Sequence, residues 1–134
     1  MPDLPLTYLP LRFRDLDAFG HVYHAEYLTL LDELRTGWLR RVGLERPSEY
    51  VVARVELDYV SSLVAEDAAV AGGFAVERVG RTSLTLAETL SAADGRVVAR
   101  SRVVAVLRDP TSGGSRAVTD AERALLAPYA TEEA

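Results

Sequence analysis

The sequence predicts one α+β domain, in which an antiparallel β-sheet is wrapped around one long central helix. Three observations predict this class. The only long helical pattern lies in the first third of the chain, the remainder mostly alternates as strands do, and the links between those strands are short. A chain of 134 residues has the usual length of one domain, so residues 1–134 are expected to form a single unit.

The first strand is expected near the N-terminus. Leu9, Leu11 and Phe13 alternate there with Pro and Arg residues. Because Pro10 has no N–H to donate to a neighbouring strand, this strand is expected at an edge of the sheet.

The helix is predicted from apolar residues that recur every three or four positions. They form one stripe: Tyr27, Leu31, Leu34, Trp38 and Val42, widened by Ala25 and Leu28. Gly43 is a usual helix stop, and Arg40 and Arg41 suit the negative end of the helix dipole.

Four more strands are expected after the loop Leu44 to Glu49. The second strand runs from about Val51 to Val60 and alternates without a break, with one face formed by Val51, Ala53, Val55, Leu57 and Tyr59. The others cover about 68–79, 83–91 and 97–107, and Asp94-Gly95 predicts a hairpin turn between the last two. Gly72 and Gly73, inside the third strand, indicate a bulge, a bend or a backbone close to another element.

A short C-terminal helix is also expected. Residues Thr119 to Glu122 have the form of a capping box, in which two side chains and two backbone N–H groups bond reciprocally. The helix should run through Leu126 and be ended by Pro128.

The composition excludes several kinds of chemistry. The chain has no Cys, Lys, Asn, Gln or Ile, and its 15 basic residues are all Arg. Disulfides, thiol catalysis, zinc–thiolate sites and Schiff-base lysines are therefore excluded. The net charge of -5 argues against nucleic-acid binding. No apolar run approaches the ~20 residues of a membrane span and no secretory signal is visible, so a cytoplasmic location is expected.

The stretch that opens the helix carries a family resemblance. Residues 14–27 read R-D-L-D-A-F-G-H-V-Y-H-A-E-Y, which places a tight acidic turn just before the helix. This turn and the element order resemble the hotdog-fold acyl-CoA thioesterases of the 4-hydroxybenzoyl-CoA thioesterase type. The resemblance runs from Leu6 to about Leu126, with a weaker match in G-R-T-S, Gly80 to Ser83. The family often has Asn or Ser where Glu26 stands.

The resemblance implies hydrolysis of an acyl-CoA thioester to a free acid and coenzyme A. Coenzyme A is then part of the substrate, and neither a cofactor nor a metal is expected. The reaction needs a group that attacks the carbonyl or activates water, and positive potential where the oxyanion develops. Asp17 is the candidate for the first role, as nucleophile or as general base. The helix N-terminal amides around Tyr23 and His24 are candidates for the second.

The resemblance implies the same assignment, with the second acid catalytic and the amide of His24 binding the carbonyl. Gly20 would let the substrate approach the backbone closely, and we expect Tyr23 to line the acyl site. Arg81, with Ser83 beside it, is the candidate for binding the phosphates of coenzyme A, because cationic side chains bind phosphate. Arg81 could equally belong to a hairpin that binds nothing.

Other interpretations of the acidic turn remain open. Asp15 and Asp17 could cap the turn and the helix, and we expect this structural role for Asp15. His21 and His24 could be a metal pair, although no third ligand is evident. A calcium-binding EF-hand loop has acidic or Gly residues at the positions matched by Asp15, Asp17, Gly20 and Glu26. It fails because Phe19 stands at a ligand position and the preceding segment is strand-like.

Two more interpretations keep the fold and change the function. A hotdog protein could bind acyl thioesters without cleaving them. It could also hydrate or dehydrate the acyl chain, with His21 or His24 pairing with Asp17.

The sheet is expected to meet a second copy of the chain. Along the predicted strands, several valines occupy the same alternate positions as the charged residues, which face away from the helix. They are Val52, Val60, Val98, Val104 and Val106. Such a face suggests surface partly buried by a partner. The resemblance implies dimers, commonly paired into tetramers, with sites at the subunit boundary, so we expect a homo-oligomer.

Overall fold

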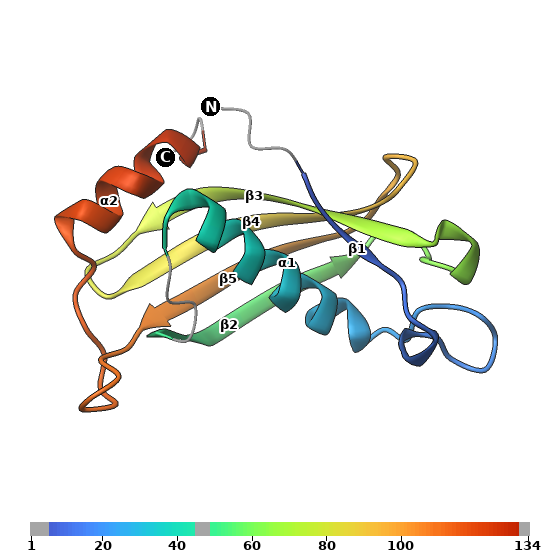
Figure 1. The fold of residues 1–134 in the computed structure, drawn as a ribbon, viewed down its shortest axis with the longest axis horizontal. Coiled ribbons are helices and arrows are strands. Elements are labelled where there is room, and N and C mark those ends of the chain that lie inside the picture. Colours follow the sequence, from blue (N-terminus) through green and yellow to red (C-terminus); the bar gives the residue numbers. More distant parts are fainter. Residues whose placement is uncertain (1–5, 45–48, 132–134) are drawn as a thin grey trace.

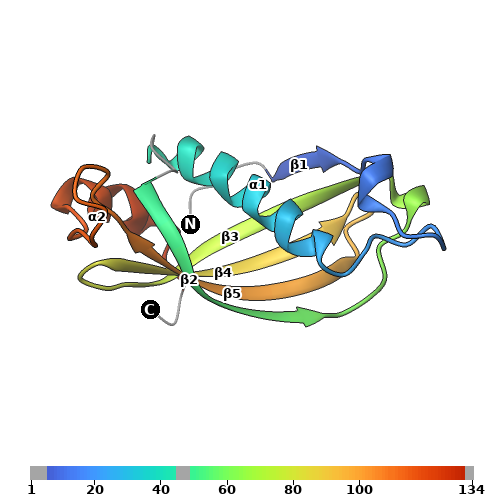
Figure 2. The same cartoon turned by 90° about the horizontal axis from the view of Figure 1, so that it is seen from below.

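The computed structural model describes residues 6–44 and 49–131 of the chain. It contains a five-stranded antiparallel sheet in the order β1-β3-β4-β5-β2. The strands are β1 (Thr7–Pro10), β2 (Tyr50–Tyr59), β3 (Ala69–Val79), β4 (Ser83–Ala92) and β5 (Val97–Leu107). Helix α1 (Glu26–Val42) lies across one face, here called the inner face, and α2 (Asp120–Leu126) lies near the C-terminal end of α1 (Figures 1 and 2).

Helix α1 buries the apolar stripe that the sequence predicts. The five stripe residues Tyr27, Leu31, Leu34, Trp38 and Val42 are each at most 7% exposed. The two expected outer members of the stripe, Ala25 and Leu28, are exposed instead. Ala25 precedes the helix, and Leu28 lies about 100° round the helix from Tyr27, beyond the buried face. The helix ends at Gly43, whose φ of 116° suits Gly.

Helix α1 packs very closely on β3 at Gly72. A Cβ atom added to Gly72 would lie 3.0 Å from the Cβ of Leu34 and 2.9 Å from Cε2 of Phe74. Of the explanations that the sequence offered for the Gly pair, close approach of another element is therefore confirmed for Gly72. The irregularity in the register of β3 falls elsewhere, between Val76 and Arg78.

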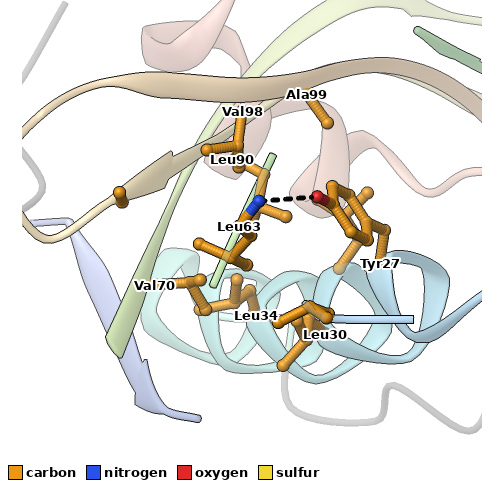
Figure 3. Packing of buried hydrophobic residues seen from close by; sticks show 11 residues of the cluster. Tyr27, Leu30, Leu34, Leu63, Val70, Leu90, Val98 and Ala99 are labelled. Carbon is orange, nitrogen blue, oxygen red and sulfur yellow. Dashed lines mark hydrogen bonds between the residues drawn. The ribbon is translucent and has the colours of Figure 1, made fainter. Parts of the chain in front are cut away.

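The core consists of two clusters, one under each half of α1. The cluster under the N-terminal half packs Tyr27, Leu30 and Leu34 against Leu63, Val70, Leu90 and Val98 (Figure 3). The cluster under the C-terminal half includes Trp38, Val42, Leu84, Leu107 and Leu126. Among the described residues, no helix combines the length and the apolar character needed to cross a membrane.

The first strand is shorter than the sequence predicts. β1 ends at Pro10, and Phe13 begins a short 3₁₀ helix, Phe13–Asp15, in which its side chain is 93% exposed. The chain turns here because Asp15 accepts a hydrogen bond from the N–H of Arg12 at 2.8 Å. The prediction that this strand lies at an edge of the sheet is confirmed.

Bulges change the predicted faces of two other strands. In β2 the register shifts between Val52 and Arg54, so the prediction that this strand alternates without a break was wrong. Val52 pairs with Ala105 and Val55 with Val103, so these two β2 residues share the inner face. In the β4–β5 pair the register shifts between Leu90 and Ser91, opposite Val98. Val98, expected on the outer face, is consequently 0% exposed in the core.

The remaining elements are confirmed closely. Strands β3, β4 and β5 agree with the predicted ranges within one residue, and Gly95 has a φ of 92° in the predicted turn. The capping box of α2 is present, with the N–H of Glu122 donating to Oγ1 of Thr119 at 3.1 Å and the N–H of Thr119 to Oε1 of Glu122 at 2.9 Å. Helix α2 ends at Leu126 and continues as a 3₁₀ turn, Ala127–Tyr129. Residues 45–48 of the predicted loop lie outside the described residues.

Candidate functional site

A cleft of about 410 Å³ opens at the N-terminal end of α1. Two segments that are far apart in the sequence build it, namely the loop before α1 and the end of β2 with the residues after it. The polar side chains that line it are Asp17, His21, His24, Tyr27, Tyr59, Ser61 and Ser62. Of the site residues that the sequence singled out, Asp17 and His24 line this cleft, whereas Gly20 and Tyr23 lie in the same loop but are not among the lining residues.

Asp17 is held in a turn formed by its own side chain. Its Oδ1 accepts hydrogen bonds from the N–H groups of Phe19 at 2.8 Å and His21 at 3.1 Å. The N–H of Asp17 donates to the carbonyl of His21 at 2.7 Å, which closes the same loop. Gly20 has a φ of 80°, so the turn itself favours glycine there. Within the described residues, Oδ2 of Asp17 makes no hydrogen bond and can meet water or a substrate.

Asp15 has a different environment and a structural role. Its side chain is 0% exposed, and its carboxylate accepts hydrogen bonds from Nε and Nη2 of Arg12, both at 3.2 Å. Arg12 also reaches Glu33 of α1 at 3.2 Å, and the carbonyl of Asp15 accepts the N–H of Tyr23 at 2.9 Å. These contacts tie the loop to α1. Because Arg12 occupies the carboxylate of Asp15, the calcium-loop alternative has no support.

Just before α1, a residue that lines the cleft has a backbone N–H without a partner among the described residues. The N-cap residue Ala25 makes no side-chain capping bond. The N–H of Tyr23 donates to Asp15 and that of Glu26 to the carbonyl of Tyr23, but in the described part of the chain the N–H of His24 has no acceptor. An unpaired N–H at a helix N-terminus is a suitable donor to an oxygen that gains negative charge. The side chain of Asp17 bonds only to N–H groups of its own turn among the described residues, so it supports that turn and does not cap α1.

Tyr23, His21 and His24 belong to the loop that precedes α1, beside the cleft. The rings of Tyr23 and His24 lie 4.5 Å apart between centroids, and Tyr23 is 43% exposed. His21 and His24 both line the cleft with exposed side chains. Among residues 6–44 and 49–131, no group of three His, Asp or Glu side chains could hold a metal.

Arg81 and Ser83 lie at the opposite end of the sheet from the cleft. Arg81 belongs to the turn between β3 and β4, and Ser83 is the first residue of β4; this turn lies next to α2 (Figure 1). The turn is fixed by the N–H of Val118, which donates to the carbonyl of Arg81 at 2.8 Å, whereas the Arg81 side chain is exposed. Helix α1 separates the two ends, and its 17 residues span ~25 Å at the usual rise per residue. Within one chain, these two residues do not reach Asp17.

Sequence reasoning missed Tyr59, which it placed only on one face of a strand. The hydroxyl of Tyr59 donates to the carbonyl of His24 at 2.7 Å, and its ring lies 4.9 Å from that of Tyr27. No local signal marks this contact, because it joins residues 35 positions apart. The structure also shows that Oε2 of Glu26 is buried without a hydrogen-bond partner among the described residues.

The sequence and the fold were compared with those of known proteins. The sequence model of the thioesterase-like superfamily matches residues 11–128. A thioesterase from Thermus thermophilus, solved in complex with coenzyme A and Zn, is 28% identical, with a TM-score of 0.81 and 92% of each chain covered. No curated protein matches the sequence.

Two further solved structures share the fold at lower identity. A protein from Bacillus stearothermophilus named as a predicted thioesterase is 24% identical, with a TM-score of 0.81, and the match covers 94% of this chain and 96% of that one. A Staphylococcus aureus protein in complex with CoA is 16% identical, with a TM-score of 0.78 over 92% of this chain and 82% of that one.

The antiparallel five-stranded sheet with few helices and these neighbours fit the hotdog fold. The family match includes the acidic turn, the cleft, the β3–β4 turn and α2. From this match we conclude that the chain belongs to the thioesterase-like superfamily.

Proposed function

We propose that this protein hydrolyses an acyl-CoA thioester to a free acid and coenzyme A. One observation carries the proposal: the free Oδ2 of Asp17 and the unpaired N–H of His24 belong to described residues that line the same cleft. An acid and an oxyanion donor are thus available to a single carbonyl group. The relative from Thermus thermophilus, which binds coenzyme A, supports the coenzyme A part of the substrate.

In the general-base route, Asp17 takes a proton from a water molecule that attacks the thioester carbon. The carbonyl oxygen becomes an oxyanion that accepts a hydrogen bond from the N–H of His24. The intermediate collapses, the carbon–sulfur bond breaks, and the coenzyme A thiolate leaves and takes up a proton. In the nucleophilic route, Oδ2 of Asp17 attacks the carbon and expels the thiolate, and water then hydrolyses the mixed anhydride. Both routes need a carboxyl oxygen without a hydrogen-bond partner, as Oδ2 of Asp17 is among the described residues.

Tyr23 and Gly20 complete this end of the site. Tyr23 is half exposed beside His24 and would contact the acyl group. Gly20, with a positive φ, holds the turn that orients Asp17. A Cβ atom at Gly20 would meet nothing within 4 Å, so the space beside this residue is open.

Arg81 and Ser83 would contact coenzyme A only from another subunit, because they lie at the far end of their own chain. Strand β2 offers a route to such an assembly. It is an edge strand of the described sheet, and Val51, Val52, Val55, Tyr59 and Val60 on or just after it are each at least 40% exposed. An unpaired edge with apolar side chains suits pairing with a second copy. We propose a homo-oligomer built through this edge, either a dimer or a tetramer.

A dehydratase is the second candidate function. It is favoured by one observation, namely that His21, His24 and Asp17 line one cleft. A His and an acid could move a proton at the acyl chain and leave the thioester intact. Release of free thiol from a panel of acyl-CoA substrates distinguishes the two functions, and binding without any turnover would indicate an acyl-thioester-binding protein.

The substitution Asp17→Asn tests the proposed mechanism. An amide can still accept the hydrogen bonds of the turn, but it can neither attack the thioester nor take a proton from water. Turnover should therefore fall by ~100-fold or more, the usual effect of losing a general base. Binding of an uncleavable thioether analogue of acyl-CoA should survive.

Asp109→Asn is the matched control. Asp109 also accepts two backbone N–H bonds through Oδ1, from Thr111 at 2.8 Å and Ser112 at 3.4 Å, in a loop that does not line the cleft. Its substitution should leave turnover unchanged. Parental turnover in Asp17→Asn would show that Asp17 only supports its turn.

A further inference from the structure

His24, whose N–H would bind the carbonyl oxygen, makes few hydrogen bonds of its own, although the N–H of Tyr23 beside it bonds to the carbonyl of Asp15. The turn that contains His24 precedes α1, and the N-cap residue Ala25 contributes no side-chain bond. The carbonyl of His24 accepts a hydrogen bond from the N–H of Tyr27 at 3.4 Å, which is long for such a bond. The helix alone therefore holds His24 weakly.

A shorter bond to this turn comes from across the cleft. The hydroxyl of Tyr59 donates to the carbonyl of His24 at 2.7 Å, near the usual length of a strong O–H···O bond. Tyr59 is the last residue of β2, where it pairs with Ala99 of β5. A residue of the sheet thus restrains the residue that would supply the oxyanion donor.

The ring of Tyr59 is oriented by its neighbours. It packs against Tyr27 at 4.9 Å and meets the ring of His24 edge-on at 6.4 Å. Tyr27 is itself fixed, because its hydroxyl accepts the N–H of Leu63 at 3.1 Å (Figure 3). Although Tyr59 is 50% exposed, its hydroxyl is directed to a backbone carbonyl in the cleft.

We propose that Tyr59 is a positioning residue for the hydrolysis. Its hydroxyl holds the carbonyl of His24, which fixes the turn so that the N–H of the same residue faces the cleft. The bond also polarises the peptide between His24 and Ala25. Tyr59 itself does not touch the reacting atoms. This inference rests on the proposed thioesterase function.

The test is Tyr59→Phe, which removes the hydroxyl and keeps the ring packing. We expect kcat to fall ~10-fold, less than the ~100-fold typical of deleting an oxyanion donor outright. KM and the affinity for the thioether analogue should stay within about twofold, because the donor matters most in the transition state. The melting temperature and the oligomeric mass should be those of the parent. Tyr8→Phe, on the exposed surface of β1, is the control and should change nothing.

Backbone amide resonances of ¹⁵N-labelled protein provide a readout independent of turnover. In Tyr59→Phe the resonances of His24 and Ala25 should shift and exchange faster with solvent, while those of Asp17 and Phe19 should not. Unchanged resonances, or parental kcat in Tyr59→Phe, would overturn the inference. If the parent protein releases no thiol from any acyl-CoA, the proposed function fails. The amide resonances then still decide whether Tyr59 holds the turn.

Discussion

His24 and Asp17 would serve the reaction through different parts of the residue. Asp17 contributes a side-chain oxygen, which no backbone group of the loop could replace. His24 contributes its N–H, which every residue except Pro also has. The imidazole of His24 is exposed and makes no hydrogen bond within the described structure. The side chain at position 24 should therefore matter less than its backbone.

The substitution His24→Ala separates the two parts of this residue. The backbone N–H remains, so the oxyanion donor is kept, and turnover should fall by less than ~10-fold. Steady-state kinetics on the same acyl-CoA as for Asp17→Asn provide the comparison. If His24→Ala loses as much activity as Asp17→Asn, the imidazole takes part in the chemistry, and the dehydratase interpretation gains weight.

The position of α1 on the sheet depends on a buried ion pair as well as on apolar packing. Arg35 of α1 donates from Nε to Glu88 of β4 at 2.5 Å and from Nη2 at 3.0 Å, and the two side chains are 3% and 0% exposed. Nη1 of Arg35 reaches Asp32 at 2.6 Å, at a side chain that is 66% exposed. Burial alone would lower the pKa of Arg35, but the bonds and charge of Glu88 raise it above its ordinary value. The guanidinium therefore stays charged inside the fold.

The two acidic partners of Arg35 should differ strongly in their effect on stability. Glu88→Gln leaves a buried charge without its counter-ion, and we expect a loss of about 3–5 kcal/mol in the free energy of unfolding. Asp32→Asn removes an exposed partner and should cost at most about 1 kcal/mol. Urea denaturation at pH 7 measures both. Equal small losses would mean that the pair adds nothing to the docking of α1.

Helix α2 is held by a second, more accessible ion pair. Arg116 donates from Nη1 and Nη2 to Glu122 at 2.8 and 2.9 Å, and Nη2 also reaches Glu49 at 3.3 Å. The bonds from Arg116 and the N–H of Thr119 lower the pKa of the Glu122 carboxyl from 4.5 to about 2. Because the folded-state pKa is lowered, the charged form stabilises the fold above about pH 4.5. That contribution is lost as the pH falls from 4.5 towards 2.

The pH dependence of unfolding tests this contribution. At pH 7, Glu122→Gln should be less stable than the parent by up to about 3 kcal/mol, the free energy that corresponds to the lowered pKa. The difference should shrink between pH 4.5 and 2, where the parent carboxylate also becomes neutral. Glu66→Gln, at an exposed glutamate, is the control and should follow the parent at every pH. A difference that stays constant with pH would exclude the charge as its cause.

Elements were predictable from the sequence where the signal is local. The five central residues of the helix stripe, the Asp94-Gly95 turn and the capping box at Thr119 depend on neighbouring residues and are confirmed, whereas the outer stripe members Ala25 and Leu28 are exposed. The face changes at Val52 and Val98 were missed because bulges arise from pairing between strands. The same limit applies to the site. The acidic turn lies in one stretch of sequence, whereas Tyr59 enters the cleft through the fold.

At the scale of the whole molecule, the proposed site is divided between two ends of the chain. The cleft with Asp17 lies at the N-terminal end of α1, and the turn with Arg81 lies at the C-terminal end. A two-fold axis perpendicular to the sheet at the β2 edge would place two helices antiparallel, so that opposite ends of two chains come to the same side. The β3–β4 turn of a second copy, with Arg81, could then lie beside the Asp17 cleft of the first chain.

Disrupting the β2 edge should therefore affect both mass and substrate binding. We expect the parent protein to have at least twice the mass of one chain by light scattering at micromolar concentration. Val55→Asp puts a charge on the edge strand β2, at a side chain that is 40% exposed, and should yield monomers, whereas Tyr8→Asp, on the opposite edge strand β1, should not.

The kinetics of the monomeric variant connect this edge to the site. If Arg81 and Ser83 act from a neighbouring subunit, Val55→Asp should bind the full acyl-CoA more weakly. It should hydrolyse a truncated thioester without the nucleotide almost as well as the parent does. Arg81→Ala should show the same pattern within an intact oligomer, because losing one charge-assisted contact costs about 1.5–3 kcal/mol of binding free energy. A monomeric parent, or equal kinetics on both substrates in Arg81→Ala, would remove the neighbouring subunit from the site.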